Sequence, residues 1–243
     1  MQIFVFRSAE EVASAASMVF AAQLYQKPDS VLGLATGSTP IPTYQALIDL
    51  AQRGLVDFSR ARTFNLDEYV GLAPDHPCAY RRFMNEQLFL HIPIDPDNTH
   101  VPSGLGDPAE NARAYDRMIE AAGGIDLQLL GIGLNGHIGF NEPAEDYTWG
   151  THVVTLTDST LEVNARWFDD PAKMPREAIS LGIGGIMEAK RVLLIATGAD
   201  KAQAVSRAAK GPVSPDSPAS ILRFHPNAQL MLDEAAASGL KDQ

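Results

Sequence analysis

The fold is indicated most clearly by residues 31–53, which read VLGLATGSTPIPTYQALIDLAQR. Val31–Ala35 is an apolar run of strand length, and Pro40–Arg53 is an amphipathic stretch of helix length. A glycine turn with the hydroxyl residues Ser38 and Thr39 separates the two. This order of strand, turn and helix is the repeating unit of α/β proteins.

The same alternation of apolar and amphipathic stretches continues along the whole chain. It predicts an α/β fold with three layers, in which a mostly parallel central sheet has helices on both faces. No Ser/Gly linker, low-complexity block or repeat interrupts residues 1–243, so we expect a single domain. The expected strands are Ile3–Phe6, Val31–Ala35, Arg62–Leu66, Leu127–Ile132, His152–Leu156, Ala178–Leu181, Val192–Ala196 and Leu230–Leu232, and the expected helices are Ala9–Tyr25, Pro40–Arg53, Pro77–His91, Ala109–Ala122, Ser159–Phe168 and Ala199–Ala209.

Two helix starts carry local signals. Ser8 and Glu11 have the spacing of a capping box, and Thr39 followed by Pro40 places a hydroxyl at an N-cap and proline in the first turn.

Composition excludes several classes of protein. The 243 residues hold 19 Lys+Arg against 30 Asp+Glu, a net charge of −11, which disfavours a nucleic-acid partner. No N-terminal signal peptide and no uncharged apolar run of membrane-spanning length is present, so we expect no membrane partner. The single cysteine, Cys78, cannot form an internal disulfide, and the chain therefore suits the cytoplasm.

Polar residues with chemical potential follow four of the predicted strands. They form the segments Thr36–Thr39, Asp67–Glu68, Asn135–His137 and Thr197–Lys201. Because the carboxyl ends of parallel strands meet at one edge of a sheet, we expect these segments to converge on a ligand there.

The glycine turn after the second strand has two interpretations. A helix that begins there would point unpaired amides outward, which favours a phosphate. Leu32–Pro40 matches neither the Walker P-loop nor the GxGxxG pattern, and an ordinary strand-to-helix turn is the alternative.

Asp67 and Glu68 follow Thr63–Leu66 in a stretch that otherwise reads as a buried strand. A carboxylate at a strand end in a cleft is partly desolvated, which raises its pKa and makes it a better proton acceptor. The alternative is a pair of solvated loop acids or helix caps.

Residues 131–143, GIGLNGHIGFNEP, are the most informative segment. Four glycines surround His137, whose imidazole can exchange protons near neutral pH, and Glu142 is spaced to fold back and orient it. A metal site is the rival interpretation. With one cysteine and no HxH or HExxH pattern, we expect no metal.

Two basic residues are further candidates for substrate binding, whereas the other histidines are not. Arg166 and Lys201 are candidate phosphate-binding cations, with exposed basic residues on helices as the alternative. We expect structural or solvated roles for the histidines at positions 76, 91, 100, 152 and 225.

Residues 63–72, TFNLDEYVGL, together with residues 131–143, resemble the signatures of the glucosamine-6-phosphate deaminase family. The resemblance continues to Pro218–Pro226 and covers most of the chain. It implies a modified Rossmann-like fold and conversion of D-glucosamine 6-phosphate and water to D-fructose 6-phosphate and ammonia. It also implies that no cofactor is required.

The resemblance assigns roles residue by residue. Asp67 matches the base that removes the C2 proton, His137 the acid–base group that opens the ring, and Glu142 the carboxylate that supports this histidine. We add Asn135 to the catalytic group and Glu68 to the substrate-binding residues. The phosphate-binding positions implied are Gly37, Ser38, Thr39, Arg166 and Lys201.

Two departures from the family pattern carry expectations. Asn135 stands where the hexameric members have aspartate, so His137 is expected to rely on Glu142 for its charged partner. Glu145, His152 and Val154 replace serine, arginine and lysine of the allosterically activated branch. We therefore expect no activation by N-acetylglucosamine 6-phosphate, in a monomer or small homo-oligomer.

Two other functions compete with this interpretation. The related 6-phosphogluconolactonases have a different acidic motif and a different end to the histidine loop, which favours the deaminase. A sugar-phosphate sensor would need a DNA-binding segment, and it has no use for both Asp67 and His137.

Overall fold

A seven-stranded parallel sheet with the order β1-β10-β9-β6-β2-β3-β5 forms the main body of the protein. The computed structural model describes residues 1–165, 168, 170 and 173–240. The strands of this main sheet are β1 (Gln2–Phe6), β2 (Val31–Leu34), β3 (Arg62–Asn65), β5 (Thr99–His100), β6 (Leu127–Leu130), β9 (Val192–Ala196) and β10 (Ala228–Asp233).

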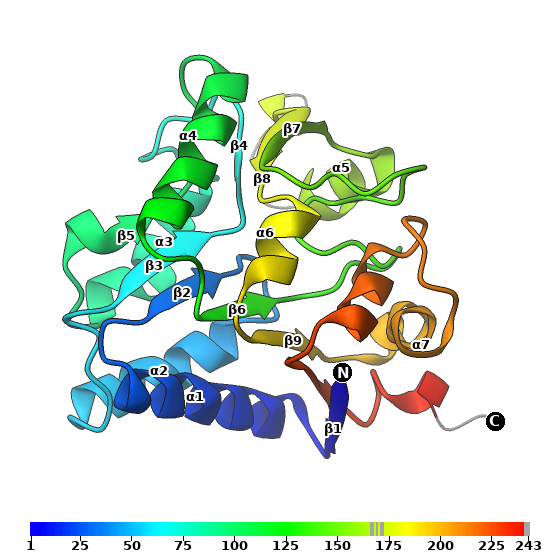
Figure 1. The fold of residues 1–243 in the computed structure, drawn as a ribbon, viewed down its shortest axis with the longest axis horizontal. Coiled ribbons are helices and arrows are strands. Elements are labelled where there is room, and N and C mark those ends of the chain that lie inside the picture. Colours follow the sequence, from blue (N-terminus) through cyan, green and yellow to red (C-terminus); the bar gives the residue numbers. More distant parts are fainter. Residues whose placement is uncertain (166–167, 169, 171–172, 241–243) are drawn as a thin grey trace.

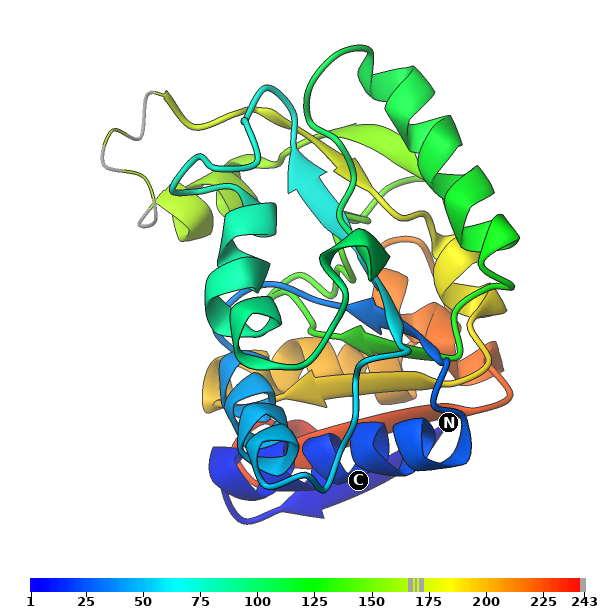
Figure 2. The same ribbon diagram turned by 90° about the vertical axis from the view of Figure 1, so that its left-hand side faces the viewer.

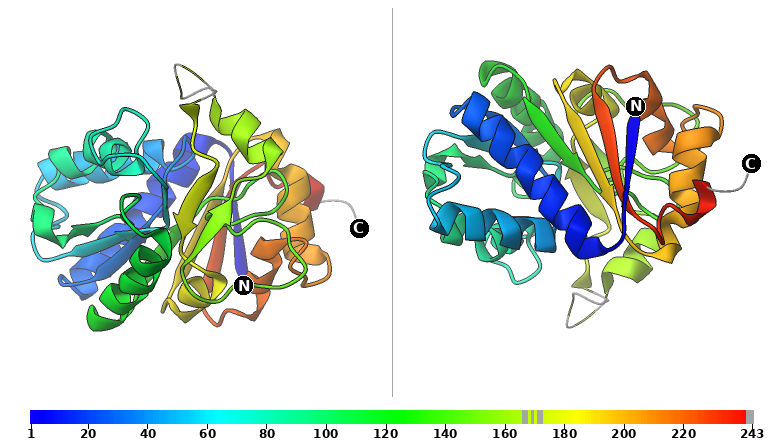
Figure 3. Two further views of the ribbon diagram at one scale, coloured as in Figure 1. Left: turned by 90° about the horizontal axis from the view of Figure 1, so that it is seen from above. Right: turned by 90° about the horizontal axis from the view of Figure 1, so that it is seen from below.

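The helices flank this sheet (Figure 1). α1 and α2 pack against each other, and α1 runs across the sheet when the molecule is seen from below (Figure 3). The α-helices are α1 (Ala9–Gln26), α2 (Ile41–Gln52), α3 (Tyr80–Gln87), α4 (Pro108–Ala121), α5 (Asp158–Ala165), α6 (Ile183–Glu188) and α7 (Ala202–Lys210). Short 3₁₀ segments lie at Phe89–His91, Pro96–Asn98, Ala199–Lys201, Pro218–Phe224 and Ser238–Leu240.

A second sheet of three antiparallel strands, in the order β4-β8-β7, lies above the main sheet (Figure 2). Its strands are β4 (Asp67–Tyr69), β8 (Glu177–Ser180) and β7 (His152–Thr155). The α/β class with a mostly parallel central sheet is confirmed, but the placement of β7 and β8 in that sheet was wrong. The sequence also gave no sign of β4, β5 or α6, because three-residue and two-residue strands and a one-and-a-half-turn helix are too short for a periodic pattern.

The middle of the main sheet forms the core. Every residue of β2, β6 and β9 is buried, as expected for parallel strands that are covered on both faces, and Gln128 of β6 is the one polar side chain in these three strands. β1 lies at the edge of the sheet, and its first four residues are exposed.

One of the two predicted helix starts is confirmed. The Ser8 hydroxyl accepts a hydrogen bond from the Glu11 amide (3.3 Å), which caps α1. The prediction that Thr39 caps the next helix was wrong, because Pro40 itself occupies the N-cap of α2 and no side chain caps this end. None of the described helices is both long enough and apolar enough to cross a membrane.

Candidate active site

A cavity of about 500 Å³ opens at the carboxyl ends of β9, β6, β2 and β3. The four segments that the sequence predicts to converge all contribute to its wall, so their convergence is confirmed. The lining residues that had been singled out are Thr36, Gly37, Ser38, Thr39, Asp67, Asn135, His137 and Lys201.

The turn between β2 and α2 presents backbone amides at one end of the cavity. Gly37 has φ = +99°, a conformation that glycine adopts without strain. Within the described residues, the N–H groups of positions 37–39 donate to no other part of the chain. The buried hydroxyl of Tyr44 donates to the Ala35 carbonyl (2.5 Å) and accepts from the Ala35 amide (3.2 Å), which braces the start of the turn. Such a turn suits an anionic group.

Asp67, the first residue of β4, lines the cavity two residues after the end of β3 and is only 5% exposed. Burial, and secondarily the charge of Glu68, raises its pKa from 3.8 to about 8. In the part of the chain that the structure describes, no hydrogen bond to this carboxylate offsets its burial. The hydroxyl of Tyr115 donates to the Asn65 carbonyl (2.7 Å) and fixes the strand just before it. Asp67 therefore has the properties of a proton acceptor.

Glu68 lies elsewhere, and its assignment to direct substrate binding is not supported. It is absent from the cavity wall, and its carboxylate accepts hydrogen bonds from the amides of Tyr69 (2.8 Å), Tyr80 (3.0 Å) and Arg81 (2.9 Å). The last two amides belong to the first turn of α3. Burial raises the pKa of Glu68 although these amides oppose the effect. The helix-cap alternative considered for this acid pair therefore applies to Glu68.

A short glycine-rich loop after β6 positions His137. A Cβ added at Gly133 would lie 2.2 Å from the imidazole of His137, so only glycine lets the ring pack against the backbone there. The Gly133 amide also donates to the His137 carbonyl (3.0 Å), which closes the loop. The side chain of His137 is 23% exposed and lines the cavity.

Asn135 connects His137 to Glu142. The Asn135 amide nitrogen is 2.6 Å from Glu142 Oε2, and because a carboxylate only accepts hydrogen bonds, this nitrogen must be the donor. Asn135 Oδ1 therefore faces His137 and lies 2.8 Å from its Nδ1. Nδ1 must then carry the proton, which leaves Nε2 as the acceptor in the neutral ring.

The expectation that His137 relies directly on Glu142 is thus modified. Glu142 Oε2 lies 3.4 Å from His137 Nδ1, farther than Asn135 does. Burial alone would raise the pKa of Glu142, but interactions with His137, Thr160 and Asn135 outweigh it and lower the pKa to about 2. Glu142 is therefore ionised near neutral pH, and Asn135 transmits its influence to the imidazole.

Of the two basic residues that the sequence predicts at the cavity, the structure describes one, Lys201, and it adds a second, Arg207. Lys201 lines the wall, whereas Arg166 lies outside the described residues. Arg207 on α7 also lines the cavity, and its Nη2 lies 3.4 Å from the Leu134 carbonyl. Sequence reasoning missed Arg207, Tyr80 and Thr160, because each sits in an amphipathic or polar helix with no motif of its own.

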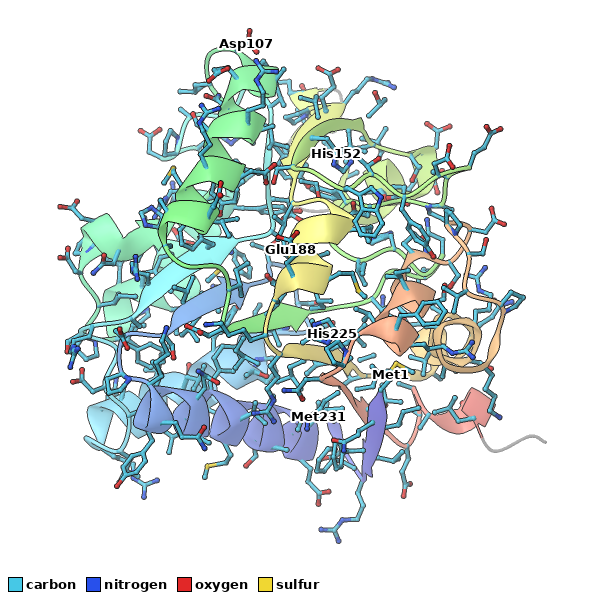
Figure 4. The ribbon with its side chains drawn as sticks, in the orientation of Figure 1. Met1, Asp107, His152, Glu188, His225 and Met231 are labelled. Atoms are coloured by element: carbon cyan, nitrogen blue, oxygen red, sulfur yellow. The ribbon has the colours of Figure 1, made fainter. Side chains whose placement is uncertain are left out.

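The other histidines do not form a common site. His225 is buried beside the main sheet, where its Nε2 lies 2.7 Å from the Ala189 carbonyl and its Nδ1 accepts from the Asn227 amide (3.0 Å). His152 belongs to the second sheet and lies well apart from His225 (Figure 4). No group of three or more His, Cys, Asp or Glu side chains suited to a metal ion occurs among the described residues.

Comparison with known proteins assigns the family. A family model described as glucosamine-6-phosphate isomerases/6-phosphogluconolactonase matches residues 7–231. The chain belongs to this family. Among the curated members of the glucosamine-6-phosphate isomerase/6-phosphogluconolactonase family, the glucosamine-6-phosphate deaminase of Shewanella woodyi is 52% identical, covering 100% of this chain and 92% of that protein. The glucosamine-6-phosphate deaminase of Thermoanaerobacter pseudethanolicus is 47% identical, covering 100% of this chain and 96% of that one.

Two solved structures are similar to this chain over almost its whole length. A monomeric glucosamine-6-phosphate deaminase superimposes with a TM-score of 0.96 at 42% identity, over 98% of this chain and 100% of that chain. A 6-phosphogluconolactonase from Trypanosoma brucei gives a TM-score of 0.76 at 22% identity, over 98% of each chain. The second likeness shows a shared fold.

Proposed function

We propose that this protein is a glucosamine-6-phosphate deaminase, which converts D-glucosamine 6-phosphate and water to D-fructose 6-phosphate and ammonia. The observation that carries the proposal is that Asp67 and His137 line one cavity together with an anion-binding turn and Lys201. Full-length identity of 47–52% to glucosamine-6-phosphate deaminases supports it.

We assign the substrate phosphate to the Gly37–Thr39 turn. Its free amides and the nearby hydroxyls of Ser38 and Thr39 supply hydrogen bonds, and Lys201 and Arg207 supply positive charge. Anchoring this remote group holds the reacting carbons against Asp67, a positioning effect worth up to about 7–11 kcal/mol in favourable cases.

Ring opening is assigned to His137. Neutral His137 accepts the proton of the anomeric hydroxyl at Nε2, and the resulting imidazolium returns a proton to the ring oxygen as the C1–O5 bond breaks. The proton on His137 Nδ1 stays there and is donated to Asn135 Oδ1, and the ionised Glu142 behind Asn135 stabilises the positive ring.

Asp67 then moves the C2 proton. Its carboxylate removes this proton from the open-chain aldehyde, whose carbonyl makes the C–H acidic, and an enolamine forms. Return of a proton to C1 leaves an imine at C2, and water adds to this imine to release ammonia and the ketose. C1 is reduced as C2 is oxidised, so proton transfers and one water molecule balance the reaction and no external oxidant or reductant is needed.

A coupled assay tests the proposal. Ammonia and fructose 6-phosphate should appear in equal amounts from glucosamine 6-phosphate, while 6-phosphogluconolactone should be hydrolysed no faster than in buffer. Lactone hydrolysis without ammonia release would replace the deaminase with the lactonase, and tight binding of glucosamine 6-phosphate without turnover would favour a sensor.

A further inference from the structure

Thr160, on α5, makes a contact that none of the assigned roles uses. Its side chain is buried, at 6% exposed, and its hydroxyl donates a short hydrogen bond to Glu142 Oε1. The other carboxylate oxygen, Oε2, accepts from Asn135. The two oxygens of Glu142 are therefore held from opposite sides, one by the histidine loop and one by α5.

This arrangement fixes the orientation of Glu142. Its side chain is only 7% exposed, so water contributes little to holding the carboxylate. With one oxygen held by Asn135 alone, the carboxylate could rotate about its terminal bond, whose torsional preference is weak. The Thr160 hydroxyl removes this freedom, and it also accepts a hydrogen bond from the hydroxyl of Thr157 (3.2 Å), which leaves its proton directed at Glu142.

The contact also joins two parts of the molecule. Glu142 follows the loop after β6 of the main sheet, whereas α5 packs by Leu161 and Ala165 against the cluster around Tyr69 and Phe140. A displacement of α5 would therefore be transmitted to the carboxylate behind His137.

We propose that Thr160 is a positioning residue of the proposed deaminase, whose hydroxyl holds Glu142 in the orientation that supports the Asn135–His137 pair during ring opening. This inference rests on the proposed function for its effect on turnover. The effect on Glu142 itself follows from the contact geometry and is measurable without substrate.

The test compares Thr160→Val, which removes the hydroxyl at nearly constant volume, with Thr160→Ser, which keeps it. Thr155→Val is the matched control, because Thr155 is an exposed β7 residue away from the cavity. We expect Thr160→Val to lower kcat about ten-fold with KM changed less than two-fold, and Thr160→Ser to restore most of the activity.

Carbon-13 NMR titration of the Glu142 carboxyl provides the readout that is independent of activity. Thr160→Val should raise its pKa, whereas Thr160→Ser and Thr155→Val should not. If the wild type releases no ammonia, the proposed function fails while this titration still decides the role of Thr160. Wild-type kcat and an unmoved Glu142 titration in Thr160→Val would overturn the proposal, as would equal defects in the valine and serine variants. Thr160→Ala serves for the same measurements if the valine variant does not fold.

Discussion

At the level of single residues, the surroundings of two buried acids, Asp67 and Glu142, shift their pKa values in opposite directions. Asp67 is buried, no hydrogen bond from the described residues offsets this burial, and its pKa rises to about 8. Glu142 is also buried but is held by Asn135, Thr160 and His137, and its pKa falls to about 2. Near neutral pH one carboxyl group is ready to exchange a proton and the other is a fixed negative charge, which matches the two roles proposed for them.

Replacement of Asp67 should isolate the proton-transfer step. We expect Asp67→Asn to lower kcat by about 10²–10⁴-fold and to abolish exchange of the C2 proton with solvent, because the amide cannot act as a base. Binding of fructose 6-phosphate should remain within a few-fold of the wild type. Mass spectrometry of the sugar after incubation in D₂O measures the exchange, and undiminished deuterium incorporation would remove Asp67 from this role.

Asp67→Asn should also be more stable than the wild type, by an amount that grows as pH rises. The folded-state pKa of Asp67 lies above its unfolded value, so the wild type loses stability between about pH 4 and pH 8, where the unfolded chain releases this proton first. Asp67→Asn lacks this loss. We expect its Tm to exceed that of the wild type by about 2–5 °C at pH 8, with little difference at pH 4.

Thermal unfolding followed by circular dichroism at pH 4, 6 and 8 measures this difference. Asp75→Asn is the control, since Asp75 is an exposed aspartate outside the cavity wall. A Tm advantage that is independent of pH would contradict the linkage to Asp67 ionisation.

Site residues that lie in short sequence motifs could be predicted, and those that depend on the packing of distant helices could not. Asp67 and His137 lie in short motifs directly after strands, so sequence places both at the same sheet edge. The hydrogen-bond pattern of Glu68 depends on where α3 begins, twelve residues later, and could not be read from the chain. Arg207 and Thr160 reach the cavity only through the packing of α7 and α5, and neither position is marked by sequence spacing.

At the scale of elements, long periodic segments were predictable and short pairings were not. α1, α2 and α4 lie close to their expected bounds because each repeats an apolar face over three or more turns. β4 follows β3 after a single residue, Leu66, and the sequence predicts only one strand, Arg62–Leu66, where the structure has two strands in different sheets. The choice of partner for β7 and β8 depends on contacts between distant parts of the chain, which periodicity does not encode.

Asp126 joins three elements at the edge of the main sheet opposite the cavity. Its buried carboxylate accepts hydrogen bonds from Lys27 (2.5 Å), Lys190 (2.7 Å) and the amide of Val31 (2.8 Å). We expect Asp126→Asn to lower the free energy of unfolding by about 1–3 kcal/mol, with kcat unchanged.

The pH dependence of this effect has a definite sign. Burial raises the pKa of Asp126, but the hydrogen bonds from Lys190 and Lys27 outweigh it and the net pKa is lowered. Its stabilising contribution is therefore present above about pH 4 and is lost as pH falls further. Urea unfolding should show a larger difference between Asp126→Asn and the wild type at pH 7 than at pH 3; an equal difference at both would contradict this linkage.

At the scale of the whole molecule, an anionic substrate meets a protein of net charge −11. Positive charge at the cavity must offset this field, and Arg207 lies exposed at its wall. We expect Arg207→Gln to raise KM about 3–10-fold with kcat within two-fold, and the difference to shrink in 0.5 M salt because of screening.

Lys210→Gln is the matched control for Arg207. It removes the same charge from the same helix, but Lys210 points away to the Leu240 carbonyl and does not line the cavity. Steady-state kinetics at two salt concentrations measure both variants. Equal effects of the two substitutions would assign the change to net charge instead of to a local contact.

Regulation is a further property of the whole molecule. Glu145, His152 and Val154 stand where the allosterically activated branch of the family has serine, arginine and lysine. We therefore expect the rate to depend hyperbolically on glucosamine 6-phosphate concentration and to be unchanged by N-acetylglucosamine 6-phosphate. Initial rates with and without that compound measure this, and a sigmoidal curve that it abolishes would contradict the prediction.

The position of β10 between β1 and β9 affects how the chain folds during its synthesis. On the ribosome, β1 is made first, yet the strand that it pairs with is made almost last. Until β10 emerges, the apolar stretch Ile3–Val5 has no partner in the sheet, and it would attract the chaperones that shield nascent chains. β1 can therefore join the main sheet only after β10 has been made, so the first strand of the chain is among the last to pair.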